Sequence, residues 1–135
     1  MKNIKLLLVD DEQEFVETLA ERLRLRDLGP DVALNGEAAL TIVHDSVPDV
    51  MLLDLMMPGI DGWEVLERVK GQYPDVQVIV VTGHGSDADR DRAIARGAFA
   101  YMRKPVDFDQ LVITIMAAYD RKLAMENSLS QAATA

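Results

Sequence analysis

Five short apolar runs that alternate with helix-like segments restrict the fold of this chain more than any other feature. The runs cover residues 4–9, 32–34, 50–53, 76–81 and 100–102. The runs at 50 and 76 lack polar alternation, which is typical of strands buried on both faces of a parallel sheet. Between the runs, apolar residues recur every three or four positions, and glycine or proline separates the segments. The alternation predicts an α/β fold: a (βα)5 doubly wound five-stranded parallel sheet with helices on both faces.

The chain has the length of a single domain. Its 135 residues contain no internal repeat and 49% of them are hydrophobic, so we expect a sizeable core. We predict one domain over residues 1–122 and interpret residues 123–135 as a C-terminal helix extension, a frayed tail or the stub of a linker. The fourth helical segment, residues 86–96, is rich in Asp and Arg, so we expect it to be weakly anchored.

Composition excludes several classes of function. Because it has no cysteine, the chain has no disulfide, thiolate metal site or cysteine nucleophile, which suits a reducing cytoplasm. No apolar run approaches the ~20 residues of a membrane-spanning helix, and the run at 6–9 is too short for a signal peptide. The net charge of −9 argues against direct nucleic-acid binding. We therefore predict a cytoplasmic protein that contacts neither membranes nor nucleic acid directly.

Acidic and cationic side chains follow the predicted strands. Asp10 and Asp11 come after the first strand, and Asp54 comes after the third. Thr82 ends the fourth strand and Lys104 follows the fifth. In an open parallel sheet, ligands bind outside the carboxyl ends of the strands, so these side chains are expected to surround one shallow pocket.

The pocket has the chemistry of phosphoryl transfer. Neighbouring carboxylates raise one another's pKa, and a hard divalent cation such as Mg²⁺ relieves their repulsion while keeping several waters. Lys104 adds a positive charge that neutralises a moving phosphoryl group. A carboxylate such as Asp54 can then attack and form an aspartyl-phosphate.

Each of these residues also has a structural interpretation. Asp10 and Asp11 are suited to cap the first helix, Asp54 to form an Asx-turn, and Lys104 to be a solvated loop residue. Their shared position at the ends of successive strands favours the chemical interpretation, because separate turns and caps would not require it.

The chain resembles the receiver domain of bacterial two-component response regulators, the family that includes the chemotaxis regulator. The resemblance covers about residues 3–122 and is carried by four segments: "LLLVDDE", "DVMLLDLMMPGIDGWEVL", "VIVVTGHG" and "RGAFAYMRKPVDFDQLV". It implies a flavodoxin-like strand order of 2-1-3-4-5. It also implies a cis peptide bond at Lys104–Pro105.

The resemblance assigns roles within the site. It implies that Asp54 is the phosphoacceptor, that Asp11 binds Mg²⁺ (or Mn²⁺) directly and that Asp10 acts mainly through a coordinated water. The backbone carbonyl of Met56 would supply a further metal ligand. Lys104 would pair with a phosphoryl oxygen.

The resemblance also implies a switch. Thr82 would be the switch hydroxyl and Tyr101 the switch aromatic, changing an output face formed by the fourth helix, fifth strand and fifth helix within residues 86–122. Met56 and His84 would flank the path of attacking water and tune the phosphate lifetime; for His84 a plainly solvated side chain is the alternative. The phosphoryl donor would be a sensor histidine kinase or a phosphotransfer protein. Such a domain is a signalling switch with self-phosphorylation and self-dephosphorylation chemistry and not a conventional enzyme. The resemblance leaves open whether phosphorylation produces a homodimer.

Other classes fit less well. Phosphatases of the haloacid dehalogenase kind carry a motif similar to DxD(x)T after the first strand. This chain has "VDDEQ" there, without a threonine at that offset. A dinucleotide-binding module would place G-x-G-x-x-G after Val9, and none is present. A purely structural interaction domain would leave the acids and Lys104 as coincidence.

Overall fold

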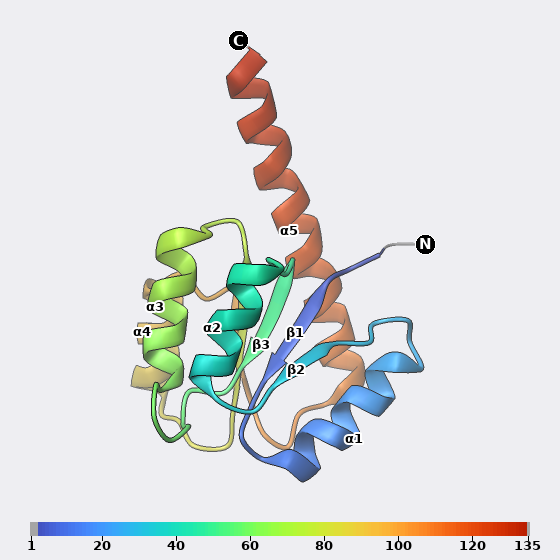
Figure 1. The fold of residues 1–135 in the computed structure, drawn as a ribbon, viewed down its shortest axis with the longest axis vertical. Coiled ribbons are helices and arrows are strands. Elements are labelled where there is room, and N and C mark those ends of the chain that lie inside the picture. Colours follow the sequence, from blue (N-terminus) through green and yellow to red (C-terminus); the bar gives the residue numbers. More distant parts are fainter. Residues whose placement is uncertain (1–2, 135) are drawn as a thin grey trace.

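The computed structural model describes residues 3–134, with the side chains described through residue 128. Strands and helices alternate along this part of the chain (Figure 1). The elements are β1 (Leu6–Val9), α1 (Gln13–Arg24), β2 (Asp31–Ala33), α2 (Gly36–Asp45), β3 (Val50–Leu53), α3 (Gly62–Gln72), β4 (Gln77–Thr82), α4 (Asp87–Ala95), β5 (Ala100–Arg103) and α5 (Phe108–Thr134).

All five strands pair in parallel in the order β2-β1-β3-β4-β5. The predicted doubly wound sheet and its order are therefore confirmed. The switch in strand order falls at β1 and β3, which are adjacent in space although α1, β2 and α2 separate them in sequence. This is the place where an open α/β sheet binds its ligand.

The sheet is covered on both faces, and each face has its own core. Alternate residues of β1, β3 and β4 face α1 and α5 on one side, whereas the residues between them face α2, α3 and α4 on the other. Leu52 and Leu53, for example, are both fully buried but lie in different cores. This explains why the strands read as continuous apolar runs.

The predicted weak anchorage of α4 is confirmed, since Ala93 is the only buried residue of this helix. A capping box between Ser86 and Asp89 closes its N-terminus. The guanidinium of Arg92 stacks 4.1 Å from the ring centroid of Trp63 in α3. The position of α4 thus depends on a few polar and cation–π contacts, which resist displacement less than a large apolar interface would.

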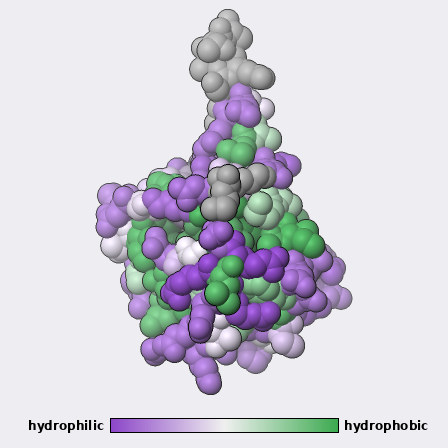
Figure 2. Space-filling model, turned by 90° about the vertical axis from the view of Figure 1, so that its right-hand side faces the viewer, coloured by the Kyte–Doolittle hydropathy of each residue, from purple (hydrophilic) through white to green (hydrophobic). Residues whose placement is uncertain are grey.

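Helix α5 continues past residue 122 to Thr134 and projects from the body of the domain (Figure 1). Lys122 forms ion pairs with Asp49 and Glu126, and Gln77 lies 3.3 Å from the sulfur of Met125. Figure 2 shows hydrophilic and hydrophobic residues together on the described part of this projection. Although α5 has 27 residues, no described helix is long and apolar enough to cross a bilayer. The domain boundary at residue 122 stays a prediction.

Candidate functional site

The pairing of β1 with β3 brings two acids together at the carboxyl edge of the sheet. Val9 is aligned with Leu53, the last residue of β3. The residues that follow, Asp10 and Asp54, therefore lie side by side just beyond the ends of the two strands. The amide of Asp54 donates to the Val9 carbonyl at 3.0 Å, extending the ladder by one residue. Both acids are buried, with relative exposures of 1% for Asp10 and 4% for Asp54. Since charged groups are seldom buried without partners, these two require cations or hydrogen-bond donors nearby.

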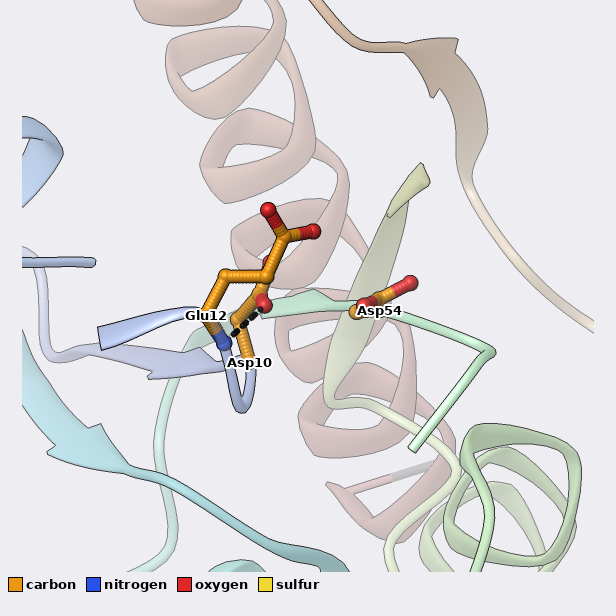
Figure 3. Close-up of side chains that lie close together, drawn as sticks. All are labelled: Asp10, Glu12 and Asp54. Atoms are coloured by element: carbon orange, nitrogen blue, oxygen red, sulfur yellow. Dashed lines mark hydrogen bonds between the residues drawn. The ribbon is translucent and has the colours of Figure 1, made fainter. Parts of the chain in front are cut away.

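Three carboxylates form the centre of the site: Asp10, Glu12 and Asp54 (Figure 3). One oxygen from each lies within 4.8 Å of the others. The amide of Glu12 donates to Asp10 Oδ1 at 2.9 Å, and the amide of Met56 donates to Asp54 Oδ1 at 3.2 Å. Asp11 is exposed and lies outside this group. The structure thus brings Asp10 and Asp54 together as predicted and adds Glu12, which the sequence reasoning missed.

Lys104 provides the positive charge of the site. Its ammonium lies 2.7 Å from Asp10 Oδ2, 2.8 Å from Glu12 Oε1 and 3.8 Å from Asp54 Oδ2. The structure places Lys104 beside the strand-end acids, as predicted. The ammonium is closest to Asp10 and Glu12, so it is shared among three acids and is not reserved for Asp54.

The end of β5 fixes the direction of Lys104. Its amide donates to the Thr82 carbonyl at 2.9 Å, which continues the pairing of β5 with β4. The peptide bond between Lys104 and Pro105 is cis, as the family resemblance implied. The ammonium also lies 4.3 Å from the ring centroid of Phe15 in α1. The lysine chain is therefore packed between elements and aimed at the acids.

Burial and charge act in opposite directions on the pKa values of the site. Burial raises the pKa of Asp10, and the charge of Asp54 adds to this, whereas hydrogen bonds from Lys104 and the Glu12 amide oppose it. Burial alone would lower the pKa of Lys104, but its hydrogen bonds to Asp10 and Glu12 raise it. The pKa of Glu12 is lowered by the same contact with Lys104. The lysine therefore stays charged, while the ionised form of Asp10 is disfavoured.

The remaining predicted residues surround this centre at different depths. Thr82 is fully buried, and its hydroxyl donates to the His84 carbonyl at 3.0 Å and accepts from the His84 amide at 3.3 Å. The Thr82 hydroxyl is thus bound within its own loop. His84 and Met56 are exposed. Tyr101 is half-buried, and its hydroxyl is covered completely.

The donor set fits a hard divalent cation. Two buried carboxylates from adjacent strands and a third at the rim supply the oxygen ligands that Mg²⁺ prefers, with open solvent on the side of Glu12 for retained waters. Burial and the neighbouring charge of Asp54 raise the pKa of Asp10, and a bound cation would oppose both effects by favouring the ionised carboxylate. The residues present are therefore compatible with Mg²⁺ or Mn²⁺.

Replacing Asp10 with asparagine should separate stability from cation binding. Since the pKa of Asp10 in the folded chain is above its ordinary 3.8, the group stabilises the fold below that pH and loses this contribution as the pH rises through the folded pKa. At pH 7 without divalent cations, Asp10→Asn is expected to increase the free energy of unfolding. Mg²⁺ at a hundredfold excess over its Kd should stabilise the parent by about 2.7 kcal/mol and the variant much less.

The measurement is denaturant unfolding of both proteins, with and without Mg²⁺. Asp45→Asn, an exposed acid outside the site, is the control and should respond to Mg²⁺ as the parent does. An equal Mg²⁺ effect in Asp10→Asn and the parent would contradict the assignment of Asp10 to the cation site.

A cavity of about 480 Å³ opens beside the centre, between α1 and the loops that follow β4 and β5. Its lining includes both polar groups of the site and apolar side chains: Glu12, Phe15, Leu19, His84, Lys104 and Phe108. The side of the site formed by Glu12 and Lys104 therefore opens to solvent along a partly apolar wall.

The family profile of the response regulator receiver domain matches residues 6–116, which is most of the chain. An NtrX-like response regulator from Rickettsia typhi is 35% identical over 130 residues, covering 94% of this chain and 27% of that protein. The transcriptional regulatory protein CpxR from Klebsiella pneumoniae is 39% identical over 117 residues, covering 87% of this chain and 50% of that protein. The chain spans about a quarter of the length of its NtrX-like relatives.

Solved structures agree in fold. A response regulator receiver domain from Clostridium thermocellum aligns with a TM-score of 0.82 at 32% identity, covering 90% of this chain and 98% of that one. NtrX from Brucella abortus aligns with a TM-score of 0.86 at 30% identity, covering 94% of this chain and 29% of that one. The strand order, the strand-end acids and these matches lead to one conclusion: the chain belongs to the receiver domain family of two-component response regulators.

Proposed function

We propose that this receiver domain is a phosphorylation-dependent switch in which Asp54 accepts a phosphoryl group. The observation that carries the proposal is the placement of Asp54: its carboxylate is buried at the switch point, beside Asp10 and 3.8 Å from the Lys104 ammonium. A carboxylate in this setting has a nearby cation to stabilise transferred charge, and a solvent-facing cavity on the Lys104 side offers a donor an approach.

The chemistry is one displacement at phosphorus. A carboxylate oxygen of Asp54 attacks, a new oxygen–phosphorus bond forms, and the bond from phosphorus to the donor atom breaks as the donor takes the electron pair. When bound, Mg²⁺ supplies charge neutralisation for the moving phosphoryl group. Lys104 then pairs with a phosphoryl oxygen, for which its ammonium must leave part of its present contact with Asp10 and Glu12.

The cation ligands on this chain are proposed to be the carboxylates of Asp10, Asp11 and Asp54 and the carbonyl of Met56. Support is strongest for Asp10 and Asp54, whose oxygens lie within 4.8 Å of each other. Glu12 belongs to the same carboxylate group, so it is a further ligand or a competitor for Lys104.

The donor is proposed to be a phosphohistidine on a sensor histidine kinase or a phosphotransfer protein. The response regulators among the relatives support this class of partner. The cavity beside Lys104 offers apolar and charged groups to a docking protein. Exposed His84, which lines this cavity, and exposed Met56, two residues after Asp54, are proposed to tune the phosphate lifetime through access of water.

The response is proposed to pass through Thr82 and Tyr101 to residues 86–122. A phosphoryl group on Asp54 adds charge and acceptor oxygens that compete for the Thr82 hydroxyl, now bound to His84. The sparse anchorage of α4 supports movement of this face, because little apolar contact resists it. An output domain or a target protein would bind to the changed face. We propose no direct contact with nucleic acid or membranes. Whether phosphorylation produces a homodimer is left open.

The test is incubation of the chain with Mg²⁺ and a small acyl phosphate donor, followed by mass spectrometry of the intact protein. We expect a stable mass gain of one phosphoryl group that requires the divalent cation. Repeated turnover of added phosphate esters would favour a phosphatase instead. No modification with any donor, including a phosphorylated histidine kinase, would overturn the proposal.

Lys104→Met is expected to slow the mass gain by at least ~10-fold, because the variant removes the cation nearest to the developing charge and keeps most of the side-chain volume. The ammonium also lowers the pKa of Asp10, so its loss further disfavours the ionised site. Initial rates measured by intact mass provide the test. Lys5→Met, at an exposed position in front of β1, is the control, and equal rates for the two variants would contradict the role of Lys104.

A further inference from the structure

The Tyr101 hydroxyl lies in a covered position above the loop between β4 and α4. Its oxygen is buried and has no hydrogen-bond partner among the described residues. Burial raises the pKa of this hydroxyl, and the charge of Asp89 adds to the effect while Arg103 and Arg90 oppose it. A tyrosine hydroxyl without a well-formed hydrogen bond is an unfavourable arrangement, so the packing of the ring and not a hydrogen bond of the hydroxyl holds it there.

Gly85 provides the space that this hydroxyl fills. A Cβ at residue 85 would lie 1.6 Å from the Tyr101 hydroxyl oxygen and 3.0 Å from the adjoining ring carbon, and 3.3 Å from the Thr82 methyl. We infer that Gly85 is a positioning residue: the missing side chain at 85 admits Tyr101 to its inner position, and any side chain there turns the tyrosine outward onto the α4–β5–α5 face.

The outward turn is the expected response because of what the added carbon would strike. The two closest atoms belong to the far end of the Tyr101 side chain, which rotates about two single bonds, so a change of rotamer removes their overlap without moving the backbone. No hydrogen bond of good geometry holds the hydroxyl in the inner position and opposes this rotation. The outward ring would join Arg103, whose guanidinium already lies 5.9 Å from the ring centroid.

Gly83 offers a matched comparison within the same loop. A Cβ at residue 83 would meet only Lys104 Cδ, at an ordinary contact distance of 3.7 Å. Neither glycine has a positive φ, so alanine adds no backbone strain at either position and restricts the unfolded chain equally at both. The two variants therefore differ mainly in whether they strike Tyr101.

The experiment uses the whole chain labelled with 3-fluorotyrosine and fluorine NMR, with the Tyr101 resonance assigned by Tyr101→Phe. In Gly85→Ala we expect the Tyr101 resonance to move and to be broadened by a soluble nitroxide more strongly than in the parent. In Gly83→Ala we expect neither change. An unmoved and equally protected Tyr101 resonance in Gly85→Ala, or the same change in both variants, would overturn the inference.

A double variant decides the matter if Gly85→Ala folds poorly. Gly85→Ala combined with Tyr101→Phe lacks the hydroxyl oxygen that makes the closest contact, so its loss of thermal stability relative to Tyr101→Phe should be smaller than the loss caused by Gly85→Ala in the parent. Equal losses would contradict the inference. Only the link from Tyr101 to signalling rests on the proposed function; parallel mass spectrometry separates the two, because Tyr101 can turn outward whether or not Asp54 accepts a phosphoryl group.

Discussion

Replacing Asp54 with asparagine is expected to abolish the phosphoryl mass gain of this chain entirely. Asparagine keeps the shape of the side chain but has no carboxylate oxygen to attack phosphorus. The variant should fold at least as well as the parent, because it removes one of two buried carboxylates and with it a charge that raises the pKa of Asp10. A loss of reaction therefore cannot be attributed to unfolding.

The measurement is intact-mass analysis after incubation with Mg²⁺ and an acyl phosphate, together with a thermal unfolding scan. Asp45→Asn, an exposed acid in α2, is the matched control and should gain mass at the parental rate. If Asp54→Asn gained one phosphoryl group as readily as the parent, the acceptor would have to be another residue.

Replacing Gly62 with alanine is expected to destabilise the fold by about 3 kcal/mol or more, at the upper end of what overpacking costs. Gly62 is buried at the start of α3, and a Cβ there would lie 2.2 Å from the Asp54 carbonyl oxygen and 2.5 Å from Leu55 Cα. These are backbone atoms, so no rotamer change relieves the overlap. The turn after β3 must shift instead, and it carries Asp54.

Gly71 provides the control within the same helix. A Cβ at residue 71 would meet nothing within 4 Å, so Gly71→Ala should stabilise the fold by about 0.5–1 kcal/mol through helix propensity. Urea unfolding of both variants gives the comparison, and Gly62→Ala should also slow phosphorylation. Similar unfolding free energies for the two variants would show that the start of α3 yields more easily than its contacts imply.

The general fold follows from the sequence alone because burial on both faces leaves a direct signature. Strands such as β3 read as unbroken apolar runs since their alternate side chains enter two different cores. The sparse apolar content of residues 86–96 likewise predicted the weak anchorage of α4, with Ala93 as its only buried residue. Local composition was sufficient in both cases, because each element meets the rest of the domain through its own side chains.

The candidate site was predictable where the position of a residue depends on strand pairing. Asp10 and Asp54 each leave a strand at its carboxyl end, and parallel pairing of β1 with β3 aligns them. Lys104 converges on them for the same reason. The roles proposed for these residues stay predictions until phosphorylation is measured.

The sequence reasoning did not predict the direction of the side chains two and three positions beyond β1. Asp11 and Glu12 are neighbouring acids of similar chemistry, yet Glu12 joins the carboxylate group and Asp11 faces solvent. The direction of such a side chain is set by the turn into α1 and by the ammonium of Lys104, which comes from a residue 92 positions away.

The sequence by itself thus determined the layers, the strand order through the family resemblance, and the acids and lysine at the sheet edge. Only the tertiary structure decided which loop acid contacts Lys104 and that the Tyr101 hydroxyl fills the space above Gly85. Periodicity and strand ends are local properties of the chain, whereas these contacts join loops and strands that meet only after the sheet has assembled. Their geometry depends on distances between elements, which no local pattern of residues encodes.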